Sequence, residues 1–188
     1  MPTLDNDQFN IIDEKSVSFT NTAVRYGLIG GAALIVYSLL SFLVFLPAGG
    51  TLLMLSGFLS FAIYVALVAM AIKHHRDEEL GGFITLGRCV GLGTLATMIA
   101  VALNTIFSYI YMNYIDPTVL DQIMDASMAM LESYMDEDQL EEIKEQSKAQ
   151  QGSLMGGLIQ PIFFSVFTGL IISAITGLIM RKNPPSMI

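Results

Sequence analysis

Few residues in this chain have the types and spacing that chemistry requires. His74 and His75 are adjacent, and histidine titrates near neutral pH and binds metal ions. Adjacent side chains do not share a helix face, however, and no further histidine or nearby cysteine completes a ligand set. We therefore predict no metal site, and we interpret the pair as part of a basic boundary in a polar loop over residues 73–82.

The acidic residues do not form a calcium-binding loop either. An EF-hand loop needs oxygen ligands at fixed spacings and a glycine at its turn. The run Asp136-Glu137-Asp138-Gln139-Leu140 places leucine where a ligand belongs and contains no glycine. No P-loop, dinucleotide fingerprint, zinc signature or nucleophile elbow occurs in the sequence. The sequence thus predicts no enzyme, no cofactor and no catalytic residue.

Asn104 and Gln160 are the most polar side chains inside otherwise apolar segments. Ionisable residues at mid-bilayer are costly and usually mark transport paths, and these segments contain none there. Amide side chains at such depth commonly form hydrogen bonds between helices, and we interpret Asn104 and Gln160 in this way. The alternative is that Asn104, Gln160 and a bend at Pro161 line the path of a small transporter or channel.

The overall composition explains why polar groups are so scarce. Of the 188 residues, 53% are hydrophobic and only 14% are charged, and the mean hydropathy is +0.60. These values lie outside the range of an ordinary soluble domain and indicate a membrane protein. Cys89 is the single cysteine, so no intrachain disulfide is available.

Four apolar segments are long enough to cross a bilayer. About twenty helical residues span a hydrocarbon core of about 30 Å. The predicted spans cover about 26–46, 52–72, 86–115 and 154–180. They form one membrane domain over 26–182, between a polar N-terminal tail at 1–25 and a C-terminal tail at 183–188. The predicted fold class is all-α: a polytopic membrane protein with four transmembrane helices and an amphipathic acidic extracytoplasmic helix between spans three and four.

The basic residues near the span ends all fall on one side of a four-span topology. They are Arg25, Lys73, Arg76, Arg88, Arg181 and Lys182. Cytoplasmic ends of membrane spans carry an excess of lysine and arginine, so both termini are predicted to be cytoplasmic. The insert at 116–151 is then extracytoplasmic.

That insert carries the net charge of the chain. It contains ten acidic residues and two lysines, while the acids and bases elsewhere cancel, and the total is −8. A protein without a basic surface is a poor candidate for binding nucleic acid, and we predict no nucleic-acid partner.

The insert also has the pattern of an amphipathic helix. Asp116-Pro117 is a helix-start signal, and Asp136 with Gln139 predicts a break followed by a second short helix. Apolar residues recur at spacings of three and four between them: Leu120, Met124, Met128, Leu131 and Met135. This face lies either on the lipid interface and the tops of the spans, or against another protein. An acidic helix is repelled by acidic headgroups, which favours contact with protein.

Small residues repeat four apart along three spans. Such stripes allow helix backbones to approach closely in a membrane. The residues are Gly27, Gly31, Gly87, Gly91, Gly169, Ser173 and Gly177. They pack either the monomer, which we favour, or a homo-oligomer.

Three sequence features together resemble a known bacterial family. They are the run IFSYIYMNYIDPTVLDQIMD, the glycine-rich GGFITLGRCVGLGTL before it, and a final span that ends in Arg181-Lys182. They resemble the family called domain of unknown function 4199 over about residues 17–182. The resemblance implies a four-helix protein of the bacterial cytoplasmic (inner) membrane and supplies no assigned activity.

The main functional hypothesis is a non-enzymatic accessory or scaffold subunit. Its acidic amphipathic helix would bind a membrane protein partner, for example an enzyme of envelope biosynthesis, while the bilayer surrounds its spans. The alternative is a small transporter or channel that acts as a homodimer.

Overall fold

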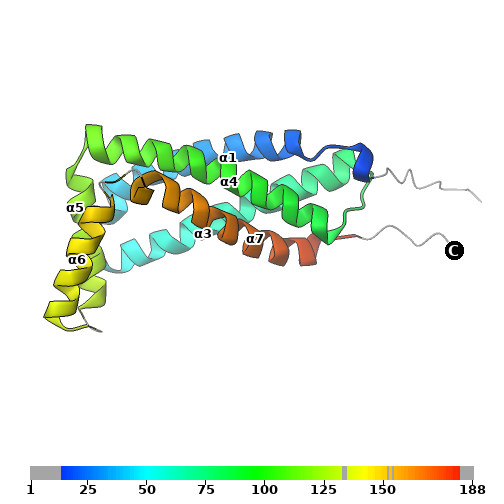
Figure 1. Cartoon of the computed structure of the whole chain (residues 1–188). Helices are drawn as coiled ribbons and strands as arrows, with labels where there is room; N and C mark the ends of the chain where they lie inside the picture. Colours follow the sequence, from blue (N-terminus) through cyan, green and yellow to red (C-terminus); the bar gives the residue numbers. More distant parts are fainter. Residues whose placement is uncertain (1–13, 133–134, 152, 154, 183–188) are drawn as a thin grey trace, which may run out of the picture.

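The computed structural model describes residues 14–132, 135–151, 153 and 155–182. The chain folds into long helices joined by short turns (Figure 1). The long helices are α1 (Thr20–Leu40), α3 (Gly50–His74), α4 (Leu86–Ile110), α5 (Thr118–Leu131), α6 (Glu137–Gln151) and α7 (Gln160–Met180). The shorter elements are the 3₁₀ turn η1 (Glu14–Ser16), α2 (Leu46–Ala48) and four π-helical turns: η2 (Ser41–Phe45), η3 (His75–Glu79), η4 (Tyr111–Ile115) and η5 (Met155–Ile159).

Within the described residues, four helical segments are long and apolar enough to cross a membrane. They are Thr20–Ala48, Leu55–Glu79, Leu86–Ile115 and Met155–Met180. This confirms the prediction of an all-helical fold with four candidate spans. The start of α1, the α3–α4 connection and the end of α7 lie together at one end of the bundle, which we call the terminal end (Figure 1). The opposite end carries α5 and α6, and we call it the arm end.

Residues 73–79 differ from the predicted polar loop. Helix α3 continues through His74, and the π-helical turn η3 extends it to Glu79. The turn itself is made by Gly81 and Gly82, whose φ angles of 67° and 98° favour glycine. The helix persists because its charged side chains bond to one another and to neighbouring helices.

Helix α4 lies at the centre of the bundle and packs on both α1 and α7. A Cβ at Gly27 would lie 2.7 Å from the Cβ of Ile99, so only glycine permits this approach of α1 to α4. The other small residues are placed as follows: Gly31 against Leu103, Gly91 near the Phe19 ring, Gly169 against Thr94 and Thr97, Ser173 against Gly93, Gly177 against Cys89, and Gly87 facing open space. All except Gly87 therefore contact other parts of the same chain.

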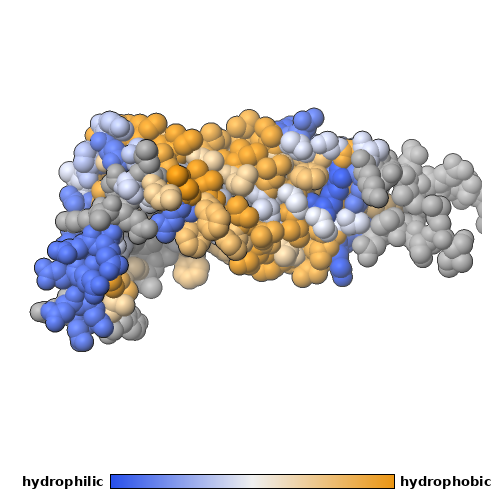
Figure 2. Space-filling view, in the orientation of Figure 1, coloured by the Kyte–Doolittle hydropathy of each residue, from blue (hydrophilic) through white to orange (hydrophobic). Residues whose placement is uncertain are grey.

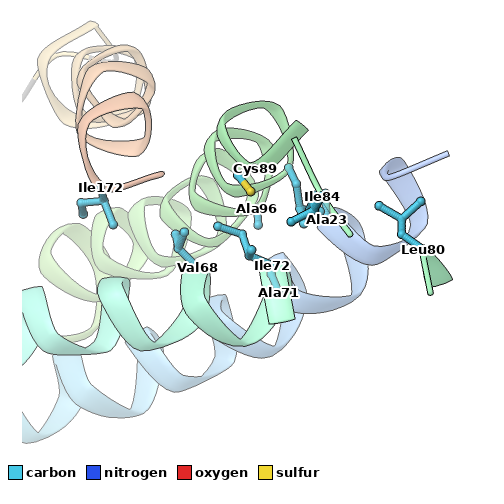
Figure 3. Close-up of a cluster of buried hydrophobic side chains, with 10 residues drawn as sticks. Ala23, Val68, Ala71, Ile72, Leu80, Ile84, Cys89, Ala96 and Ile172 are labelled. Carbon is cyan, nitrogen blue, oxygen red and sulfur yellow. The ribbon is translucent and has the colours of Figure 1, made fainter. Parts of the chain in front are cut away.

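The main buried cluster lies at the terminal end, where α1, α3, α4 and α7 meet (Figure 3). Its members are Ala23, Val68, Ala71, Ile72, Leu80, Ile84, Cys89, Leu92, Ala96 and Ile172. Several of these side chains are small, so the helices can pack closely. In a membrane the resulting van der Waals contact holds helices together, because the hydrophobic effect does not drive their association.

Helices α5 and α6 form an arm that projects across the arm end of the bundle (Figure 1). The predicted break is confirmed, since α5 ends at Leu131 and α6 begins at Glu137. The backbone N–H of Asp136 donates to Gln139 Oε1 at 3.4 Å, which is half of the expected capping arrangement. Figure 2 shows hydrophilic side chains gathered over the arm and apolar ones covering the spans.

Candidate functional site

The apolar face of α5 is seated on the chain's own spans. Val119 and Met124 are 2% and 3% exposed, and Val119 forms a buried cluster with Leu46 and Tyr111. Of the other residues predicted on this face, Leu120, Met128 and Leu131 are half-buried, whereas Met135 is exposed. Most of this face therefore fixes the arm to the bundle.

The opposite side of the arm is acidic and exposed. Its exposed acids are Asp121, Asp125, Glu132, Asp136, Asp138, Glu141, Glu142 and Glu145. Lys144 Nζ on α6 lies 3.6 Å from Asp125 Oδ1 on α5, so this ion pair links the two helices. An exposed pair contributes little stability, and the arm keeps a strongly negative surface.

Beneath α5 lies a cavity of about 690 Å³ that we call the apolar notch. Its lining residues are Ser41, Phe42, Leu46, Ser56, Gly57, Phe58, Phe61, Ile123, Ala126, Ser127 and Met130. The wall formed by α3 continues into the outer surface of the bundle, because Phe58 and Phe61 are 75% and 55% exposed. The notch therefore opens sideways, onto the outer surface of α3.

Two further cavities, of about 340 and 300 Å³, adjoin between α4 and α7 and share Asn104, Thr105 and Pro161. We call them together the polar crevice. The larger one is also lined by Ser108, Tyr109, Met112, Asn113, Leu120, Ile123, Gly156 and Gly157, and the smaller by Tyr64, Val101, Phe164, Ser165 and Thr168. The structure thus brings Asn104 and Pro161 together, as the transport alternative required. Gln160 is half-buried at the start of α7 and lines neither cavity.

Asn104 also makes the interhelical hydrogen bond expected of an amide in a membrane span. Ser38 Oγ on α1 donates to Asn104 Oδ1 at 2.8 Å. Asn104 is only partly buried, and it lines both cavities of the crevice. Asn104 therefore links two helices and lines a cavity at the same time.

A polar network closes the terminal end of the bundle, and the sequence interpretation missed it. His75 is fully buried, and its Nδ1 lies 2.5 Å from Glu79 Oε2. Glu79 Oε1 accepts a 2.5 Å bond from Thr22 Oγ1 on α1, and Arg88 Nε on α4 donates to His75 Nε2 at 3.0 Å. Arg88 also donates through Nη2 to the carbonyl oxygen of Val17. The spacing of four residues between His75 and Glu79 is the one signal that pointed to this network.

The bonding pattern fixes the state of His75. Because Nε2 accepts from Arg88, the ring carries its proton on Nδ1 and donates it to Glu79. Both ring nitrogens are occupied, so this histidine has no lone pair to offer a metal ion or a substrate proton. Its role in this arrangement is to join α1, α3 and α4.

A known protein family matches most of this chain. The family described as "Protein of unknown function (DUF4199)" matches residues 25–182. No curated protein and no solved structure matches the chain. The family match extends from the second turn of α1 to Lys182, two residues beyond the last span, and it includes the arm, the notch and the crevice. The chain therefore belongs to the DUF4199 family, as the sequence motifs predicted.

Proposed function

We propose that this protein is a non-enzymatic accessory subunit of the bacterial inner membrane, which binds a partner membrane protein at its arm end. The proposed orientation has the arm outside and both termini in the cytoplasm. It rests on the six basic residues of the span ends, all of which belong to the terminal end. The observation that carries the proposal is the apolar notch, which opens sideways beneath an acidic arm.

The notch has the properties of a seat for a transmembrane helix. Helices in a membrane associate through close packing rather than through the hydrophobic effect, and small residues at the contact allow that packing. Five of the lining residues are small: Ser41, Ser56, Gly57, Ala126 and Ser127. Phe58 and Phe61 extend the wall toward the surrounding bilayer. A partner helix that ends beneath α5 would bury this surface more completely than mobile lipid chains.

The negative charge of the arm favours partners with basic residues near the outer end of their membrane helix. Its exposed acids would meet basic residues next to the partner's helix, on the outer side of the membrane. Such complementarity contributes mainly to orientation and to the rate of association. Acidic lipid headgroups would be repelled by the same surface, which favours a protein as the occupant of the notch.

The structure changes which residues we expect at the interface. Leu120, Met124, Met128 and Leu131 are half-buried or buried against the chain itself. Met130 and Met135 are 46% and 37% exposed, and methionine adapts readily to a partner's surface. We therefore assign the partner contact to these two methionines, the notch and the acidic side of the arm.

The test is a pull-down from native membranes with a matched pair of variants on α5. Ser127→Trp fills the notch, and it loses only a hydroxyl that donates to Ile123 O in its own helix. Ala129→Trp adds the same side chain at an exposed position of α5 outside the notch. Tagged protein is purified in mild detergent, and co-purifying proteins are identified and counted by mass spectrometry.

The proposal predicts a stoichiometric partner with the wild-type chain and with Ala129→Trp, and its loss with Ser127→Trp. Retention of the partner by Ser127→Trp would contradict the seat in the notch. A homo-oligomer without any partner would contradict the accessory role.

A further inference from the structure

A small cavity of about 240 Å³ lies at the terminal end, between the second turn of α1 and the end of α3, and we call it the terminal pocket. Its lining residues are Tyr26, Met70, Lys73, His74, Asp77 and Glu78. All except Tyr26 follow one another at helical spacings of three and four along α3 and η3, so they share one face of that helix. The pocket therefore gathers both bases and acids on a single helical stripe.

This stripe changes from apolar to basic to acidic along the axis of the helix. Met70 is 51% exposed on the apolar outer surface, and Lys73 is the first charged residue after the uncharged run 50–72. Asp77 and Glu78 follow one turn later, about 6 Å beyond Lys73 at 1.5 Å per residue. A zwitterionic phospholipid beside this helix presents its acyl chains, its phosphate and its ammonium group in the same order.

Opposite charges line this pocket without pairing with each other. Among the described residues, neither Lys73 nor Glu78 makes an ion pair or a side-chain hydrogen bond, and both are exposed. Asp77 accepts from Arg76 Nε at 2.6 Å, which fixes the carboxylate, and its oxygens keep further lone pairs. A ligand that carries both a negative and a positive group would satisfy both kinds of side chain at once.

A ligand with a single charge would match only half of the pocket. An anion would pair with Lys73 and be repelled by Asp77 and Glu78, and a metal cation would be repelled by Lys73. The ring of Tyr26 lies 5.5 Å from that of His74, so α1 closes one side of the pocket with groups that can donate to a phosphate. The volume is below the range of about 300–1,000 Å³ for drug-sized ligands, which leaves space for a headgroup alone.

We infer that the terminal pocket binds a phosphoethanolamine group, the headgroup of phosphatidylethanolamine. Lys73 pairs with the phosphate, and Asp77 and Glu78 accept from the primary ammonium. Glycerophosphoethanolamine presents the same chemistry without acyl chains, but the exposed apolar surface at Met70 favours the lipid. The inference rests on neither the proposed partner nor the proposed orientation, because the terminal pocket and the notch share no lining residue.

The experiment titrates the full chain, purified in mild detergent, with lipids of identical acyl chains. The probes are phosphatidylethanolamine, phosphatidylglycerol, which lacks the ammonium group, and phosphatidylcholine, whose methylated nitrogen has no N–H to donate. Native mass spectrometry counts the bound lipids and gives a Kd for each. Glycerophosphoethanolamine is added as a soluble competitor, which distinguishes the free headgroup from the lipid.

Two variants and two matched controls locate the site. Lys73→Met and Glu78→Gln each remove one charge of the pocket at an exposed position, so neither leaves a buried group unpaired. Lys182→Met makes the first change at an exposed position of the terminal end outside the pocket, and Glu141→Gln makes the second on the arm.

The inference predicts that one phosphatidylethanolamine binds more tightly than either other lipid. Lys73→Met should weaken this binding about fivefold, Glu78→Gln should abolish the preference over phosphatidylglycerol, and the controls should change neither. Displacement by glycerophosphoethanolamine assigns a headgroup that binds without its chains, and its failure to compete assigns the bilayer lipid. Equal binding of the three lipids, or an unchanged preference in Glu78→Gln, would overturn the inference.

Discussion

Replacing Glu79 with alanine removes the acceptor at the centre of the terminal network. Glu79 accepts from His75 Nδ1 and from Thr22 Oγ1, each at 2.5 Å. The two donor side chains belong to residues that are 0% and 2% exposed, so both lose their partner in a buried place. The variant is therefore expected to be strongly destabilised.

The magnitude follows from the number of donors left unpaired. A buried donor without an acceptor costs about 1–3 kcal/mol. The Glu79 side chain is 29% exposed, so water reaches part of the space it leaves and reduces the cost. We expect a loss of about 2–4 kcal/mol for Glu79→Ala. Glu79→Gln retains one acceptor oxygen and should cost about half as much.

The assay is unfolding by sodium dodecyl sulfate in mixed micelles, followed by circular dichroism. Glu78→Ala, at the exposed neighbouring position, is the control and should change stability by less than about 0.5 kcal/mol. If Glu79→Ala is no less stable than this control, the network does not hold the helices together and the reasoning fails.

Three further predictions concern packing. Gly93→Ala should destabilise the bundle by about 1–3 kcal/mol in the same assay, because its Cβ would lie 2.3 Å from Ser173 Oγ, whereas Gly87→Ala should not. Met124→Ala should cost about 2–5 kcal/mol and make α5 more accessible to protease, and an unchanged digestion pattern would contradict its anchoring role. The thiol of Cys89, which is fully buried, should react with a maleimide only after unfolding, and rapid labelling of the native protein would contradict its burial.

The spans and the arm were predictable because each depends on local pattern. Uncharged segments of sufficient length predict spans wherever they occur. The start of α5 after Asp116-Pro117 and the break before Glu137 follow from capping residues in the sequence. None of these features requires knowledge of which helices are neighbours.

The notch and the crevice were not predictable because, in a membrane span, the residues that face lipid and those that face the bundle interior are both apolar. Phe58 is 75% exposed and Leu67 is 2% exposed, yet hydropathy does not distinguish them. The sequence identified Asn104 but not the phenol of Tyr64 on α3, which lines the same cavity. The sequence predicts a polar loop after Lys73, because the partners that keep this segment helical, Thr22 and Arg88, lie on other helices.

The separation of charge between the two ends of the bundle has a consequence for how the chain enters the membrane. With the proposed orientation, the insert at 116–151 crosses to the outside and carries a net charge of −8. An inside-negative membrane potential drives negative charge outward, by about 2.3 kcal/mol per charge at 100 mV, or about 18 kcal/mol for the whole insert. The membrane potential thus favours transfer of the acidic arm to the outside during insertion. The same potential opposes transfer of the basic residues of the terminal end, which favours keeping them in the cytoplasm.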